Sequence, residues 1–164
     1  MTALSTQSRK IIGWHCHVYF RPELRERAVR LNEDLQDQFR IWDYRWLDAP
    51  NLLHPMPMFR FQFPRADLAR FIEWITLNRN ELSVLIHAIT GDDLFDHSYN
   101  AIWLGQPLTL NLDGLREMLD QVARGELPES IVPASQVCEE PAVVAQVRYR
   151  PGDDAHLQRP GDAE

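Results

Sequence analysis

Residues 11–20, which read IIGWHCHVYF, constrain the fold of this chain more than any other stretch. Successive side chains of a β-strand point to opposite faces, so an extended segment here separates into two unlike sets. One set is apolar and comprises Ile12, Trp14, Cys16, Val18 and Phe20. The other set comprises Gly13, His15, His17 and Tyr19. The pattern predicts a strand that packs one face into a core and presents two imidazoles on the other.

His15 and His17 lie two residues apart, so on a strand they point the same way, about 7 Å apart along the backbone. Both can therefore reach one ion, and a rigid strand would hold them there. A sheet face that merely carries two histidines explains the His-x-His pattern equally well, because histidine is common at surfaces. The rest of the chain has to decide between these interpretations.

Length and composition favour one ordinary globular domain. The chain has 164 residues, of which 45% are hydrophobic and 25% charged, and a domain of this size can bury a substantial core. The net charge of −7 argues against a nucleic-acid partner, which would require a basic face. No window approaches the ~20 apolar residues of a membrane span, and residues 1–10 lack the apolar run of a signal peptide.

The two cysteines, Cys16 and Cys138, bear on location. Cys16 falls on the predicted core face, which makes a structural disulfide improbable. Sparse cysteine of this kind is typical of a reducing compartment. We therefore expect a cytoplasmic protein.

The order of the elements predicts the fold class. Helical stripes occur at Leu24, Ala28, Leu31 and Leu35, and again at Leu68, Phe71, Ile72 and Ile75. Extended segments are expected at residues 39–47, 58–63 and 83–89. The resulting order is strand, helix, strand, strand, helix, strand. This order favours an α+β, ferredoxin-like split βαβ plait, which is a four-stranded antiparallel sheet with both helices on one face. Right-handed crossovers place the first and third strands centrally, with the fourth beside the first.

This topology gathers polar side chains on the open face of the sheet. In residues 58–63 the phenylalanines alternate with Arg60 and Gln62, and in residues 83–89 His87 opposes the apolar set. Three of the six histidines, His15, His17 and His87, therefore converge on adjacent strands. The face would also present Tyr19, which suits a flat ligand, whereas Arg60 and Gln62 suit an anionic, hydrogen-bonding one.

Two loops add further candidates. His54 lies in the loop before residues 58–63, and Asp96 and His97 lie in the segment TGDDLFDHS, residues 90–98. Asp96 can orient His97, complete a two-histidine, one-carboxylate site, or simply serve the loop or a helix cap. Residues 101–110 are expected to fold back as a covering segment, and a final helix is expected to begin at residue 111 or 113.

Aromatic side chains and the C-terminal region suggest self-association. Trp42, Tyr44 and Trp46 can line a pocket, or else cover an edge strand or a dimer contact. We expect a functional domain over residues 1–125 and, over residues 126–164, a proline-punctuated extension that is partly disordered or forms a dimer arm. The alternation in residues 143–149 favours pairing with a second subunit. Together with the uncovered sheet face, this predicts a homodimer.

Clustered neutral imidazoles beside an aspartate are ligands for iron, zinc, copper or nickel. Three protein ligands leave coordination positions open for a substrate, as a catalytic metal requires. The residues alone therefore indicate a small metalloenzyme that acts on a polar aromatic compound.

At four places the sequence resembles the DOPA 4,5-dioxygenase family. The motifs are WHCHVYF at residues 14–20, HPMPMF at 54–59, LSVLIH at 82–87, and DH at 96–97 followed by AIWLG at 101–105. The resemblance runs from residue 11 to 112, and the combined spacing is specific where His-x-His alone is not. It implies a ferredoxin-like, dimeric enzyme that cleaves a catechol with O₂ and a non-haem metal, normally Fe(II), although zinc or another divalent ion can be present.

The histidines have the following expected roles. Strand geometry favours His15, His17 and His87 as ligands. His54 and His97 then compete for the acid–base role, or one of them replaces His15 as ligand. Two other functions stay open. One is a non-catalytic, dimeric ferredoxin-like protein that binds a small aromatic compound or a metal. The other is a zinc hydrolase, which would consume no oxygen.

Overall fold

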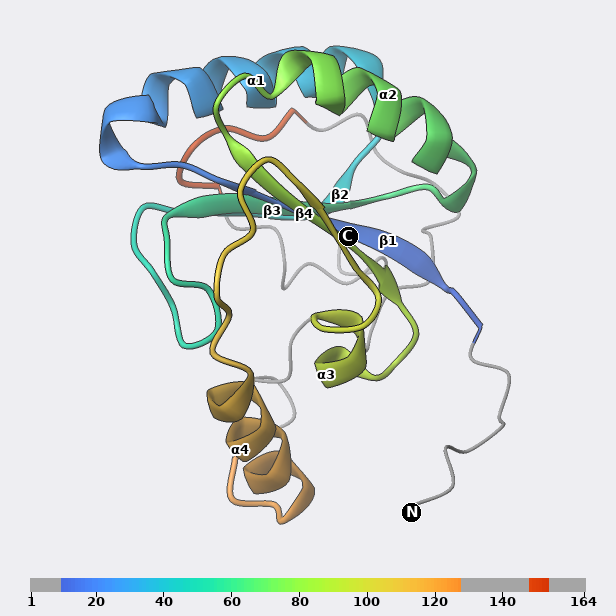
Figure 1. The fold of residues 1–164 in the computed structure, drawn as a ribbon, viewed down its shortest axis with the longest axis vertical. Helices are drawn as coiled ribbons and strands as arrows, with labels where there is room; N and C mark the ends of the chain where they lie inside the picture. The colour runs from blue at the N-terminus through green and yellow to red at the C-terminus, as the bar shows by residue number, and fades with distance from the viewer. Residues whose placement is uncertain (1–9, 128–147, 154–164) are drawn as a thin grey trace, which may run out of the picture.

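The computed structural model describes residues 10–127 and 148–153 (Figure 1). The strands are β1 (Gly13–Tyr19), β2 (Trp42–Leu47), β3 (Met58–Phe63), β4 (Ser83–Ile89) and β5 (Ala101–Leu104). The helices are α1 (Arg25–Gln38), α2 (Leu68–Asn78), α3 (Asp93–Asp96) and α4 (Leu112–Ala123), with short 3₁₀ turns at Pro22–Leu24 and Arg65–Asp67. No described helix is long and apolar enough to cross a membrane.

The five strands form one antiparallel sheet in the order β2-β3-β1-β4-β5. Helices α1 and α2 lie along one face of the sheet, and α3 lies on the opposite side (Figure 1). The predicted α+β class, with β1 and β3 central and β4 beside β1, is confirmed.

The sheet has five strands where the sequence predicted four. Residues 101–104, expected only as a covering segment, pair with β4 as β5. The physical reason lies in their alternation. Ile102 and Leu104 pack against the helix-side core, whereas Ala101 and Trp103 pack on the other face of the sheet. A segment that is apolar on both faces gains more from pairing with an edge strand than from lying across it.

The core lies between the sheet and helices α1 and α2. In the strand register Cys16 pairs with Phe61 of β3 and with Ile86 of β4, and all three are fully buried. Phe63 stacks on Phe71 of α2 with the ring centroids 4.3 Å apart. Each such apolar side chain contributes about 1.5–3 kcal/mol through burial, and this layer fixes β1 between its neighbours.

Strand β2 contains a bulge at Asp43. The register with β3 shifts between Trp42 and Arg45, and Asp43 has a φ of 50°. Tyr44 and Trp46 then face the helix-side core, where they are 0% and 6% exposed. These two aromatics therefore pack in the core of their own chain rather than lining a pocket.

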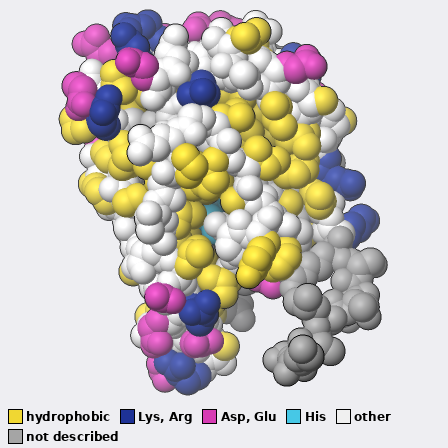
Figure 2. Space-filling model, in the orientation of Figure 1, with side chains coloured by type: hydrophobic (Ala, Val, Ile, Leu, Met, Phe, Trp, Pro, Cys, Tyr) yellow, Lys and Arg dark blue, Asp and Glu magenta, His cyan; other side chains and the backbone are white. Residues whose placement is uncertain are grey.

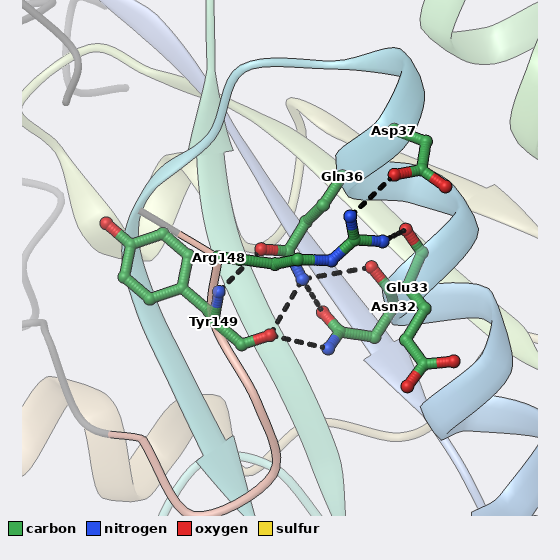
Figure 3. A network of polar contacts seen from close by, with 6 residues as sticks. All are labelled: Asn32, Glu33, Gln36, Asp37, Arg148 and Tyr149. Atoms are coloured by element: carbon green, nitrogen blue, oxygen red, sulfur yellow. Dashed lines mark hydrogen bonds and ion pairs between the residues drawn. The ribbon is translucent and has the colours of Figure 1, made fainter. Parts of the chain in front are cut away.

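Residues 148–153 return to the first helix (Figure 3). The Tyr149 backbone donates to Gln36 at 2.6 Å, its carbonyl accepts from Asn32 and Gln36, and Arg148 forms an ion pair with Asp37 at 2.8 Å. The Tyr149 ring stacks on Tyr44, with centroids 4.8 Å apart. This part of the extension therefore packs on its own chain. Most of the expected dimer arm, residues 126–164, and most of the alternating segment, residues 143–149, lie outside the described residues.

The sheet face opposite α1 and α2 is covered, contrary to the expected open face. His15, Tyr19 and Gln62 are 3%, 1% and 0% exposed. Helix α3 and the segments that carry Met56, Leu108 and Leu110 cover this face. Loops that cover a sheet leave no periodic pattern in the sequence, so this cover was not predicted.

Candidate metal centre

Strand register assembles the first part of the site. His15 of β1 lies directly opposite His87 of β4, and on the other side it faces Gln62 of β3, while His17 faces Arg60. Antiparallel partners share a face. The predicted convergence of the three strand histidines is therefore present, with the His15 and His17 ring centroids 4.3 Å apart.

Two loops bring His54 and His97 to the same place. The His54 backbone N–H donates to the Asn51 side chain at 2.7 Å, and the Asn51 N–H donates to the His54 carbonyl at 3.0 Å, which closes a tight turn before β3. His97 follows α3, and its backbone N–H donates to the Asp93 carbonyl at 3.0 Å. The His97 ring lies 4.1 Å from that of His87. Both loop histidines are 4% exposed.

The five rings form two overlapping sets that could each hold a metal ion. We call His15, His17 and His87 the first histidine group, and His17, His54 and His97 the second histidine group. Within each group one nitrogen from every ring lies within 4.8 Å of the others. His17 belongs to both groups, so it is the centre of the cluster.

Backbone carbonyls orient two of the rings. Nδ1 of His87 donates to the Ala88 carbonyl at 2.8 Å, and Nδ1 of His97 donates to the Asp93 carbonyl, also at 2.8 Å. A histidine that ligates a metal usually donates its other ring N–H in this way. The Tyr19 hydroxyl lies 2.7 Å from Nδ1 of His54, which orients a third ring.

Burial keeps all five imidazoles neutral. It lowers the pKa of His15, His17, His54 and His87 well below the usual value, and neighbouring positive charge adds to the effect. Burial lowers the pKa of His97 to about 4. The neutral imidazole is the form that binds metal.

An ion pair closes one side of the cluster. Arg60 donates to Asp43 at 2.9 Å and to Nε2 of His15 at 3.1 Å, and Gln62 donates to the same Asp43 oxygen at 3.0 Å. All four residues are buried, with at most 8% exposure. Strand alternation predicted Arg60 and Gln62 at the site. It did not predict Asp43, because a bulge interrupts the alternation.

Asp96 does not orient His97, which corrects one of the predicted roles. Its carboxylate accepts from the Thr90 backbone at 2.8 Å, from the Thr90 hydroxyl at 2.8 Å and from Asn100 at 2.9 Å. These bonds close the loop around α3, and the ring of His97 instead uses the Asp93 carbonyl. Asp96 therefore stabilises the loop, which was one of its three expected roles.

Asp93 is a further acid that the sequence did not single out from its neighbours. It is 2% exposed, and neither carboxylate oxygen has a hydrogen-bond partner. Burial raises its pKa to about 7, the charges of Asp96 and Asp92 add to this, and Arg60 opposes it.

Access to the cluster is visible at the surface. Histidine atoms lie at the bottom of an opening that hydrophobic side chains border (Figure 2). Among the described residues near the cluster, Trp103 stacks on Tyr19 with ring centroids 5.8 Å apart. A planar, largely apolar molecule would fit such surroundings.

The donor set fits a transition metal. Buried nitrogens without partners occur at Nδ1 of His15 and of His17, and buried polar atoms normally have a partner. Five neutral imidazoles without a thiolate are typical of iron, zinc, copper or nickel sites, and three ligands leave positions for a substrate.

The sequence model of the Dopa 4,5-dioxygenase family matches residues 14–114, which include all five histidines. The chain belongs to the Dopa 4,5-dioxygenase family. The matched range covers the five-stranded sheet from its second residue on and ends in α4. The fold and the histidine cluster are thus both within the family region.

The chain is also similar to individual curated proteins. The chain is 28% identical over 123 residues to a DOPA 4,5-dioxygenase of Amanita muscaria, covering 69% of this chain and 54% of that protein. It is 31% identical over 119 residues to an uncharacterised 21.2 kDa protein of Botryotinia fuckeliana, covering 65% of each. The chain thus spans about half to two thirds of the length of these curated relatives.

A crystal structure of a proposed dioxygenase from Nostoc punctiforme superimposes with a TM-score of 0.63 at 38% identity. The match covers 66% of this chain and 94% of the other. It supports both the family fold and an enzymatic assignment.

Proposed function

We propose that this dioxygenase-family protein is an extradiol ring-cleaving enzyme that acts on a catechol, using O₂ and a non-haem metal, Fe(II). The observation that carries the proposal is the convergence of five buried, neutral imidazoles in two ligand-like groups. The relationship to a DOPA 4,5-dioxygenase supplies the reaction class. DOPA itself and other dihydroxy-aromatic compounds are all candidate substrates.

Three of the five histidines would hold the metal, and His17 is in either group. The bound metal would supply Lewis acidity toward the catechol oxygens and a template for O₂. The carbonyl contacts of His87 and His97 would keep those rings in a fixed orientation. Zinc or another divalent ion could take the same nitrogens during isolation.

Other side chains would bind the substrate and move its protons. Burial raises the pKa of Tyr19 well above the usual value, so its hydroxyl stays protonated beside Nδ1 of His54. That pair can pass a proton between the substrate and a ring nitrogen. The Gln62 side-chain oxygen, buried and without a partner, can accept from a substrate hydroxyl, and Arg60 adds positive charge to that wall.

An anaerobic reconstitution tests the proposal. Protein loaded with Fe(II) under anaerobic conditions should consume O₂ and form a coloured semialdehyde when a catechol is added, while the corresponding monophenol gives neither signal. Protein loaded with Zn(II) serves as the matched control and should consume no O₂. Metal-dependent ester cleavage without O₂ uptake would instead identify a hydrolase, and the proposal would be wrong.

The homodimer and the cytoplasmic location stay predictions. The uncovered sheet face no longer supports the dimer, because segments of the same chain cover it. Sedimentation or light scattering of the full chain would decide the oligomeric state.

A further inference from the structure

Contacts with backbone carbonyls and with Arg60 indicate where three of the histidines carry their proton. A neutral imidazole has one N–H and one lone pair, a carbonyl oxygen can only accept, and a guanidinium can only donate. His87 and His97 donate from Nδ1 to carbonyl oxygens at 2.8 Å. Both rings therefore carry a lone pair on Nε2.

The proton of His17 follows from its neighbour. Nε2 of His17 lies 3.2 Å from Nε2 of His87. Because that atom of His87 carries a lone pair, Nε2 of His17 can donate to it when no metal lies between the two nitrogens. The lone pair of His17 is then on Nδ1, which is buried and has no partner.

His54 can supply a lone pair in the same way. Its Nδ1 lies 2.7 Å from the Tyr19 hydroxyl, and a hydroxyl oxygen can accept. When His54 donates there, its Nε2 is left with the lone pair. Every ring of the second histidine group, His17, His54 and His97, can therefore offer a free lone pair to a metal.

His15 differs from these rings. Arg60 donates to Nε2 of His15 at 3.1 Å, so the lone pair of this ring is already used. The proton is then on Nδ1, which is buried and lacks an acceptor. An unsatisfied buried donor is unfavourable, and a ligand oxygen that accepts from it would satisfy it.

Asp43 fixes the Arg60 guanidinium. Its carboxylate accepts from Arg60 at 2.9 Å and from Gln62 at 3.0 Å. It reaches them from the β2 bulge, with a φ of 50° that non-glycine residues seldom adopt. Bulges and left-handed residues are concentrated at functional sites, where they aim a side chain.

We propose that Asp43 and Arg60 keep His15 out of the metal ligand set and make its Nδ1–H a hydrogen-bond donor to an anionic oxygen of the substrate, such as a deprotonated phenolic oxygen. The second histidine group then holds the metal. This rests on the proposed function and replaces the ligand set of His15, His17 and His87 that the sequence favoured. Asp43 and Arg60 are positioning residues, and His15 is the residue that contacts substrate.

Metal content tests the ligand set without reference to activity. We expect His15→Asn and His15→Gln to retain the metal content of the parent protein after reconstitution, whereas His54→Ala and His97→Ala lose it. Circular dichroism of each variant verifies folding. Loss of metal from both folded His15 variants would overturn the proposal and restore the first histidine group.

The same two variants separate the donor role from simple packing. The Asn amide nitrogen can take the place of Nδ1–H, whereas the longer Gln side chain reaches toward Arg60 and supplies no donor there. His15→Gln should therefore lower turnover by about 10²-fold, while His15→Asn stays within about tenfold of the parent. Equal turnover in the two variants would overturn the donor role.

Tautomers report on the positioning residues. In Zn(II)-loaded protein, ¹⁵N spectra of the imidazoles should show His15 protonated at Nδ1, and Arg60→Lys should preserve that state. Asp43→Asn, which tolerates a positive φ, should release Arg60 and mix the two His15 tautomers. A His15 ring protonated at Nε2 in the parent protein would contradict the proposal.

The outcomes distinguish this inference from the proposed function. If Fe(II)-loaded parent protein consumes O₂ with a catechol but His15 proves to be a ligand, only the inference fails. If the parent shows no O₂ uptake while metal stays bound by the second group, the reaction is wrong and the ligand set stands.

Discussion

The two faces of the central strands are equally buried but differ in chemistry. On the helix side, Cys16 and Phe61 are 0% exposed and contact other apolar side chains. On the other side, His17 and Gln62 are 1% and 0% exposed, yet both carry polar atoms without hydrogen-bond partners. Burial without satisfied polar groups opposes folding. The comparison shows that one face supplies stability, whereas the other is built to receive a ligand.

The largest expected effect comes from adjacent residues on opposite faces. His17→Ala removes the ring that belongs to both histidine groups, so metal content and turnover should both be lost while the circular dichroism spectrum stays native. Cys16→Ala is the matched control and should retain the metal, because the Cys16 thiol lies in the apolar core. Elemental analysis after Fe(II) loading measures both. A His17→Ala protein with parental metal content would mean that the cluster is not the metal site.

The next effect concerns stability rather than metal. Phe61→Ala removes a fully buried ring that lies near Phe63 and Phe71 and should lower the free energy of unfolding by about 3–5 kcal/mol. Denaturant titration measures the loss. The protein that stays folded should still bind metal, since the ring touches only the helix side. Selective loss of metal at unchanged stability would contradict this division of the two faces.

Most of this division could be predicted from the sequence, because it depends on alternation. The period of two in β1, β3 and β4 placed His15, His17 and His87 together, and the order of elements placed the strands. The features that were not predicted depend on contacts that leave no periodic pattern in the sequence. Residues 101–104 pair with β4 because their apolar side chains pack on both faces of the sheet. A bulge in β2 directs Asp43 into the site.

Loop residues show the same limit. His54 and His97 were found as candidates from their residue type, but their convergence depends on turns closed by Asn51 and Asp96. Asp93 and Asp96 are three residues apart and chemically identical. Only the structure shows that one closes the loop and the other is buried without a partner.

Acid should lower the free energy of unfolding through the buried histidines. A histidine whose folded pKa lies below its unfolded pKa stabilises the protein above the unfolded value, and the contribution is lost as the pH falls toward the folded value. The pKa of His97 is lowered from an ordinary 6.5 to about 4. As the pH of metal-free protein falls between these two values, the free energy of unfolding should decrease by about 3 kcal/mol. The other four histidines act in the same direction. Asp93 opposes them, because its pKa is raised to about 7 and protonation favours the folded state.

Denaturant titrations of metal-free protein between pH 7 and pH 4 would measure this dependence. We expect the free energy of unfolding to fall with pH, and the His97→Ala variant to have a shallower slope. Phe61→Ala, on the core face, should displace the whole curve without changing its slope. A slope that His97→Ala leaves unaltered would show that the buried imidazole does not resist protonation.

The smallest expected effect compares two buried tyrosines on opposite faces. The Tyr19 hydroxyl lies 2.7 Å from Nδ1 of His54, whereas the Tyr44 hydroxyl is buried in the core without a hydrogen-bond partner. Removing a group that orients a ligand typically costs about 10–100-fold in metal affinity. Tyr19→Phe should therefore weaken metal binding by this factor, with little change in the free energy of unfolding. Tyr44→Phe should leave the affinity unchanged, because it deletes an oxygen that bonds to nothing. Competition with a chelator measures both affinities, and equal values would show that the contact with Tyr19 does not orient His54 as a ligand.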